Sequence, residues 1–268
     1  MEKTKLICID IDSTLSYDHL TVPEENARAV RDAVREGIHT VINSGRIAPS
    51  VRDFMNQIGL ESPVPSLGGC LIEEWMGDII SEYTLRGDLA REIYDLASFM
   101  GCTLFAYRGN SWFLEKGNDD WADYEYRCSK VAATIVDFPM LLGVLSPNKL
   151  LGVSHNPERI KALMSAVNGK FSSSVDTFLS SPYYLDIVPR GVNKGTAVDR
   201  LCEYYSIKRE NVMVIGDYYN DLDMFRAAGI SVAVANAPDD VKAVTTYVTS
   251  RDSEHCAVAE AIERFALR

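Results

Sequence analysis

The sequence predicts an α/β fold in which a mostly parallel sheet is covered by helices and interrupted by an inserted α+β domain. Apolar, β-branched runs alternate with helical patterns in the first and last parts of the chain. Between them, hairpin-like pairs of strands replace this alternation. Strands that alternate with helices form parallel sheets through right-handed crossovers, whereas hairpins interleaved with helices are typical of α+β modules.

The first part, residues 1–82, begins with a strand at 6–9, whose continuous apolar run is typical of burial on both faces. A helix follows from Pro23, with two acids in its first turn, and ends near Gly37. We expect a second strand at 38–42, a helix at 49–58, a turn-rich segment at 63–69, and a hairpin formed by 70–74 and 79–83.

The inserted domain is predicted to span residues 83–186. Apolar periodicity indicates helices at 88–100, 119–130 and 157–167. Strands are expected at 103–107, 111–115, 150–154, 173–179 and 184–188. Residues 131–146 show no clear period, so no element is assigned there.

The α/β pattern resumes in the last part, residues 187–268. It predicts helices at 193–205, 222–228 and 255–266 and a helical turn at 241–244. Strands are expected at 211–215, 230–234 and 247–249. This part should therefore rejoin the sheet of the first part.

Composition limits the class of protein. The chain has 268 residues, of which 47% are hydrophobic, enough for a sizeable core. The net charge of -11 argues against nucleic acid and anionic membranes as partners. No apolar run approaches the roughly 18–20 residues that span a bilayer, and the early first strand leaves no room for a signal peptide. Six scattered cysteines without a CxxC pair favour a cytoplasmic protein without a zinc site.

Polar clusters follow the predicted core segments. Asp10 and Asp12 end the first strand, two residues apart, and so leave extended chain on the same side. Because ligands bind at the carboxyl ends of strands in open α/β sheets, this pair suits a metal ion and covalent chemistry. The other clusters come in order along the chain, as Ser44, then Lys194, then the group Asp217, Asn220 and Asp221.

Each cluster also has a purely structural explanation. Asp10, Asp12 and Ser44 could belong to turns. Lys194 could be a solvated surface residue, and the later acids could cap a helix. The order and location of all four clusters favour a functional site.

With these motifs, the chain resembles the haloacid dehalogenase-like (HAD) superfamily, most closely its Cof-type phosphatases with a C2-type α/β cap. The resemblance covers the whole chain and implies a Rossmann-like, three-layer α/β/α core with a cap domain. Its matching stretches are Asp10-Ile11-Asp12-Ser13-Thr14-Leu15, Ser44-Gly45-Arg46, Asn193-Lys194-Gly195, Gly216-Asp217-Tyr218-Tyr219-Asn220-Asp221 and Ala235-Asn236-Ala237.

The resemblance implies an aspartyl-phosphate mechanism. Asp10 would be the nucleophile, and Asp12 would protonate the leaving oxygen and then activate water. Mg²⁺ would be held by Asp10, the Asp12 backbone carbonyl and Asp217, with Asp221 ligating or orienting.

Further residues would bind the phosphoryl group or support the loops. Ser44 and Lys194 would contact the phosphoryl oxygens. Asn220 would hold its loop or the phosphate. Gly45 and Arg46 belong to the second motif, where Arg46 either reaches the substrate or, as we favour, braces the loop.

The chain departs from the family pattern at four positions. Ser13 replaces a common glycine, which is tolerable unless the position needs a positive φ. Ser44 replaces threonine and keeps the hydroxyl. Arg251 and Cys256 stand where Asn and Gly are frequent, so substrate contact by that loop can differ.

The function expected is a Mg²⁺-dependent phosphomonoesterase acting on a small metabolite, such as a sugar phosphate or phosphorylated cofactor. The cap would exclude water and choose the leaving group. A phosphomutase of the same fold (phosphohexomutase type) and a non-catalytic metabolite-binding or regulatory protein are the alternatives. Aromatic residues of the inserted domain could stack on a sugar or ring or simply pack, namely Tyr107, Trp112, Trp121, Tyr124, Tyr126, Tyr183 and Tyr184.

Overall fold

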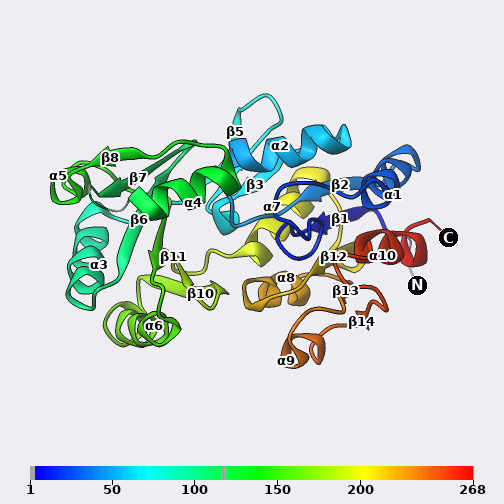
Figure 1. The fold of residues 1–268 in the computed structure, drawn as a ribbon. Helices are drawn as coiled ribbons and strands as arrows, with labels where there is room; N and C mark the ends of the chain where they lie inside the picture. The colour runs from blue at the N-terminus through cyan, green and yellow to red at the C-terminus, as the bar shows by residue number, and fades with distance from the viewer. Residues whose placement is uncertain (1–3, 116, 118, 268) are drawn as a thin grey trace. The chain divides into compact units, whose positions relative to one another are not determined.

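The computed structural model describes residues 4–115, 117 and 119–267. The chain folds into two compact units, each made of segments that are separated in sequence (Figure 1). The first unit comprises the chain up to Gly45, Val51–Ser81 and the chain from Asn193 onward. The second comprises Arg46–Ser50 and Glu82–Val192.

The first unit is built on a parallel sheet in the order β14-β13-β12-β1-β2. These strands are β1 (Leu6–Ile9), β2 (His39–Ile42), β12 (Val212–Gly216), β13 (Ile230–Ala233) and β14 (Tyr247–Val248). β1 lies between β2 and β12, so segments about 200 residues apart in sequence are hydrogen-bonded neighbours. The predicted parallel α/β sheet is confirmed.

Alternate residues of each strand point to opposite faces of the sheet, and helices pack against these apolar faces. On one face, Leu6, Cys8 and Val214 pack with residues of α7 (Lys194–Tyr205) and α8 (Leu222–Arg226). α1 (Glu24–Arg35) packs against α10 (Ala257–Phe265), and buried Asn26 accepts a hydrogen bond from Ala259 N–H. Two further α-helices are α2 (Ala48–Ile58) and α9 (Asp239–Lys242).

A small second sheet follows α2, in the order β3-β4-β5. Its strands are β3 (Val64–Ser66), β4 (Leu71–Glu73) and β5 (Ile79–Glu82), and a 3₁₀ turn, Leu67–Gly69, follows β3. The sequence predicted only a turn-rich segment at β3. Three residues containing a proline are too short to show the alternation by which strands are recognised.

The second unit contains a six-stranded sheet in the order β10-β11-β9-β6-β7-β8, antiparallel apart from the β7–β8 pair. The strands are β6 (Thr103–Arg108), β7 (Ser111–Glu115), β8 (Thr134–Val136), β9 (Lys149–Val153), β10 (Val175–Ser181) and β11 (Tyr184–Pro189). The helices are α3 (Gly87–Phe99), α4 (Asp119–Ser129), α5 (Phe138–Leu142) and α6 (Pro157–Phe171). The predicted α+β character of the insertion is confirmed, and β8 and α5 occupy the stretch where no element was assigned.

In the part of the chain that the structure describes, no helix is both long and apolar enough to cross a membrane. All six cysteines are free thiols.

Candidate active site

The candidate site is built on three neighbouring strand ends. Asp10 N–H donates to Ile215 O at 3.0 Å, and Asn43 N–H donates to Ile9 O at 2.8 Å. These bonds continue the ladders of β1 with β12 and β2 just beyond the last paired residues. Asp10, Asn43 and Asp217 therefore leave the sheet at the same edge, as expected for parallel strands.

Lys194 comes to this edge from the start of α7. Asn193 caps the helix, since its side chain accepts from Thr196 N–H while the Thr196 hydroxyl accepts from Asn193 N–H. The Lys194 Nζ lies 2.5 Å from Asp10 Oδ1 and 2.7 Å from Asp221 Oδ1. Only 2% of this side chain is exposed, so the ammonium binds the two carboxylates and has little contact with solvent.

Asp221 shapes the loop after β12. Its Oδ2 accepts hydrogen bonds from the backbone N–H of Asp217 at 2.9 Å and of Tyr218 at 3.2 Å. A Cβ at Gly216 would lie 2.4 Å from the same oxygen, so the loop can close this tightly only over a glycine. Both Asp221 oxygens are thus engaged, one with the loop and one with Lys194.

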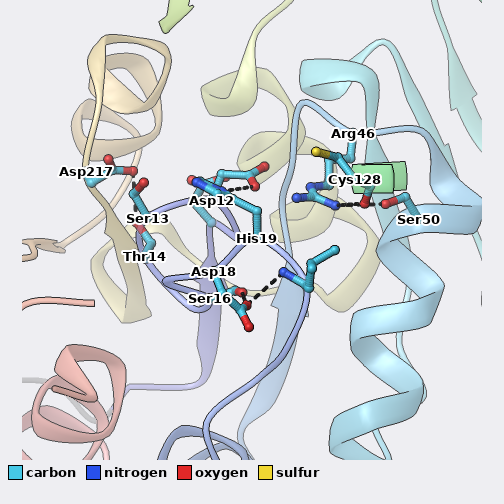
Figure 2. Close-up of polar contacts among 12 residues, drawn as sticks. Asp12, Ser13, Thr14, Ser16, Asp18, His19, Arg46, Ser50, Cys128 and Asp217 are labelled. Atoms are coloured by element: carbon cyan, nitrogen blue, oxygen red, sulfur yellow. Dashed lines mark hydrogen bonds and ion pairs between the residues drawn. The ribbon is translucent and has the colours of Figure 1, made fainter. Parts of the chain in front are cut away.

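Two polar side chains that the sequence did not single out position the main groups. The Thr14 hydroxyl donates to Asp217 Oδ1 at 3.0 Å (Figure 2). Asn43 Nδ2 donates to the Lys194 carbonyl at 2.9 Å. The sequence placed Thr14 within the first matching stretch and Asn43 just before the second, but it gave neither a role, because their partners lie 203 and 151 positions away.

The buried carboxylates form one cluster. Asp10, Asp217 and Asp221 each offer an oxygen within 4.8 Å of the others. Burial raises the pKa of Asp10 from its ordinary 3.8 to about 7, with Asp221 adding to the rise and Lys194 opposing it. Burial, followed by repulsion from Asp10, also holds the pKa of Asp217 well above its usual range.

With its three carboxylates ionised, the cluster would have more negative charge than its one ammonium can balance. Burial lowers the pKa of Lys194, but Asp10 and Asp221 outweigh it and raise that pKa above its ordinary value. Three ionised carboxylates around one ammonium leave a net charge of about -2, which is costly away from water. Oxygen donors with this charge fit a hard divalent cation such as Mg²⁺.

The second motif, Ser44-Gly45-Arg46, lies at the end of β2. Ser44 is fully buried, its N–H donates to Pro65 O, and its carbonyl accepts from Gly68 N–H. Gly45 follows, half-buried. Arg46 Nη1 donates to Ser50 Oγ at 3.1 Å and to Cys128 O at 2.7 Å (Figure 2).

The remaining predicted residues lie near the cluster in sequence but differ in surroundings. Asn220 is half-buried in the 3₁₀ turn Tyr219–Asp221, on the same loop as Asp217. The Asp12 carboxylate is 40% exposed, and its Oδ1 lies 2.8 Å from His19 Nδ1 (Figure 2). Asp12 thus differs from the buried carboxylates.

Ser13 occupies a position that does require a positive φ. Its φ is 59°, in the left-handed region that glycine adopts readily. Asn236 Nδ2 donates to the Ser13 carbonyl at 2.9 Å, and Asn236 Oδ1 accepts from Ser253 N–H at 2.9 Å. The serine is therefore strained, and Asn236 holds the strained loop.

The aromatic residues of the insertion divide into packed and exposed groups. Trp112 is buried, and Tyr107 stacks with it at 6.2 Å between ring centroids. Trp121 stacks on His155 at 4.3 Å, and the Tyr184 hydroxyl donates to Glu125 at 2.5 Å. The exposed group comprises Tyr124, Tyr126 and Tyr183.

Known proteins match the chain over nearly its full length. A curated 5-amino-6-(5-phospho-D-ribitylamino)uracil phosphatase of Bacillus subtilis is 28% identical over 266 residues, covering 98% of this chain and 96% of that protein. A crystal structure of a haloacid dehalogenase-like hydrolase from Bacteroides thetaiotaomicron has a TM-score of 0.85 at 28% identity, covering 98% and 99% of the two chains. A Thermotoga maritima crystal structure has a TM-score of 0.81 at 28% identity and covers 98% of each chain.

A match to a family model shows the family of this chain. The model of the family described as haloacid dehalogenase-like hydrolase matches residues 7–262. This range contains all four polar clusters and every strand of the parallel sheet except the first residue of β1. The chain therefore belongs to the haloacid dehalogenase-like hydrolases.

Proposed function

We propose that the protein is a Mg²⁺-dependent phosphatase that hydrolyses a small phosphorylated metabolite through an aspartyl-phosphate. The observation that carries this proposal is the Lys194 ammonium, 2.5 Å from Asp10 within a cluster of three buried carboxylates. A carboxylate held beside a cation at a strand end is suited to attack phosphorus, because the cation also offsets charge on the phosphoryl oxygens.

Asp10 would attack phosphorus and Asp12 would handle the proton. The carboxylate of Asp10 forms the new P–O bond as the bond to the leaving oxygen breaks, and Asp12 gives that oxygen its proton. Asp12 then takes a proton from the water that hydrolyses the aspartyl-phosphate. The exposure of the Asp12 side chain supports this division, since a proton carrier must reach substrate and water.

Mg²⁺ would be bound by Asp10, the Asp12 carbonyl and Asp217, and it would supply charge neutralisation at the phosphoryl oxygens. Asp221 is assigned an orienting role, because both of its oxygens already bind Lys194 and the loop. Its contacts explain how Asp217 and Lys194 keep their places when substrate arrives and leaves.

The phosphoryl group would be held by Ser44, Lys194 and Asn220, whose hydroxyl, ammonium and amide are hydrogen-bond donors. Gly45 and Arg46 are assigned to the support of the second motif. The Arg46 contacts with Ser50 and Cys128 favour bracing over direct substrate binding.

The substrate is proposed to be a small phosphorylated metabolite, such as a sugar phosphate or phosphorylated cofactor. Relatives bear names of this class, including a 5-amino-6-(5-phospho-D-ribitylamino)uracil phosphatase and an HMP-PP phosphatase of Serratia proteamaculans, 23% identical over 241 residues. We assign the choice of substrate to the cap, residues 83–186, and place the protein in the cytoplasm, in keeping with its free thiols.

The test is phosphate release from a panel of phosphorylated metabolites, with Mg²⁺ and with EDTA. Release is expected only with Mg²⁺, with Asp10→Asn inactive and Asp12→Ala strongly impaired. Trapping of phosphate on Asp10 would be checked by mass spectrometry. Activity that survives in Asp10→Asn would refute the nucleophile, and transfer to a second sugar hydroxyl without release would identify a mutase.

A further inference from the structure

The loop after β1 places the side chain of His19 beside Asp12, the proposed proton carrier. His19 Nδ1 lies 2.8 Å from Asp12 Oδ1, within hydrogen-bond distance (Figure 2). The two side chains are 44% and 40% exposed. The sequence did not single out His19, because nothing in its spacing shows where its ring points.

Asp18 fixes the path of this loop. Its Oδ1 accepts hydrogen bonds from the N–H groups of Leu20 at 2.9 Å and Thr21 at 2.7 Å, and from Ser16 Oγ at 3.0 Å. Its Oδ2 accepts from the Thr21 hydroxyl at 2.6 Å. One carboxylate thus ties together the residues on both sides of His19, in the manner of an Asx turn.

Gln57 attaches the loop to α2. Its Oε1 accepts from Val22 N–H at 2.9 Å, and its Nε2 donates to the Leu20 carbonyl at 3.0 Å. His19 itself has a φ of 61°, a conformation that costs a non-glycine residue roughly 1–2 kcal/mol. A strained residue persists where its surroundings over-determine it, often at functional sites.

We propose that His19 is a positioning residue for Asp12, a step that rests on the function proposed above. The His19 Nδ1–H donates to Asp12 Oδ1, and Oδ2 is assigned as the oxygen that carries the proton. When the P–O bond of the substrate breaks, the proton on Oδ2 passes to the leaving oxygen. Oδ2 later takes one proton from the attacking water, and His19 keeps its own proton throughout. Without the imidazole, the carboxylate loses this restraint and presents its proton to the leaving oxygen less often.

The test compares two substrates of similar shape, phenyl phosphate and 4-nitrophenyl phosphate. The leaving group of the first needs a proton in the transition state, whereas 4-nitrophenolate leaves readily without one. His19→Gly removes the ring and suits the positive φ, so the variant should melt no lower than the wild type. We expect kcat/KM for phenyl phosphate to fall at least about tenfold, part of the 10²–10⁴ typical of a general acid, and kcat/KM for 4-nitrophenyl phosphate to change little. This quantity reports the steps up to departure of the leaving group, whereas kcat also includes hydrolysis of the aspartyl-phosphate, which is the same for both substrates.

A second variant separates positioning from loss of structure. His19→Asn carries an amide donor close to the place of Nδ1, and asparagine tolerates the left-handed conformation. It should recover most of the lost kcat/KM for phenyl phosphate. His255 provides the matched control, because its Nδ1 lies 2.7 Å from the Oδ1 of Asp252, a carboxylate with no assigned part in proton transfer. His255→Gly should leave the ratio of the two kcat/KM values unchanged.

Asp12→Ala distinguishes failure of this inference from failure of the proposed function. If Asp12 is the proton carrier, its removal also affects phenyl phosphate more than 4-nitrophenyl phosphate, and adding His19→Gly to it has no further effect. Equal losses for both substrates in His19→Gly, or no recovery in His19→Asn, would overturn the role of His19. Equal losses in Asp12→Ala would refute the acid role of Asp12 and the role of His19 with it.

Discussion

Raising the pH should destabilise the metal-free protein, because the Asp10 carboxyl is buried beside two others. Its pKa is about 7 in the folded protein against an ordinary 3.8. The folded state therefore binds this proton more tightly than the unfolded chain does. The resulting stability is fully present below about pH 4 and is lost as the pH rises through 7.

The size of the effect follows from the pKa difference. About 3 pKa units at 1.36 kcal/mol each give about 4 kcal/mol over the whole range. About 3 kcal/mol of this falls between pH 5 and pH 8, since part of the loss occurs below pH 5. Mg²⁺ should offset this loss of stability, because a cation at 100 times its Kd adds about 2.7 kcal/mol to the free energy of unfolding.

The assay is urea unfolding at pH 5, 6, 7 and 8 in EDTA, for the wild type and for Asp10→Asn. The variant cannot titrate at this position, and it also removes the repulsion that Asp10 exerts on Asp217. The wild type should therefore lose at least about 3 kcal/mol more than the variant between pH 5 and pH 8. If the free energy of unfolding changed equally with pH in the two proteins, the pKa of Asp10 would not be raised in the folded state.

Further substitutions test the contacts around the cluster. Lys194→Met keeps the volume but leaves Asp10 and Asp221 without their cation. We expect the free energy of unfolding by urea, in EDTA at neutral pH, to fall by about 3–5 kcal/mol. Adding Asp221→Asn should recover part of this stability, and full stability of the single variant would contradict the ion pairs. Gly216→Ala places a Cβ against Asp221 Oδ2 and should cost about 1–3 kcal/mol and reduce phosphate release; an unchanged melting temperature would mean that the loop yields freely. Ser13→Val should cost about 1–3 kcal/mol at a φ of 59°, whereas Ser13→Gly should remain close to the wild type. Equal melting temperatures for the two Ser13 variants would argue against strain there.

The parallel sheet was predictable from the sequence because its strands are continuous apolar runs, and these are buried on both faces. The meeting of Asp10, Lys194, Asp217 and Asp221 follows from the same topology, since the strands that lead to three of them end at one edge. The catalytic roles of these residues stay predictions. Short elements were less predictable, because β3 and β8 have three residues each and show no period.

Contacts between individual side chains were not predictable. Thr14 beside Asp217 and Asn43 beside the Lys194 carbonyl depend on register and rotamer across long sequence separations. At Ser13 the sequence showed only that a usual glycine was missing, whereas the φ of 59° is a property of the folded backbone. His19 lies seven residues from Asp12, but its direction depends on the turn that Asp18 stabilises.

The pairing of β1 with β12 has a consequence for biosynthesis. The nascent chain carries Asp10 from the start but gains Lys194 only 184 residues later, and Asp217 and Asp221 later still. At about 5–20 residues per second, that interval is on the order of tens of seconds. During it β1 has only β2 beside it, with one edge unpaired and open to aggregation. Chaperone dependence of the growing polypeptide should therefore end as the β12 segment leaves the ribosome.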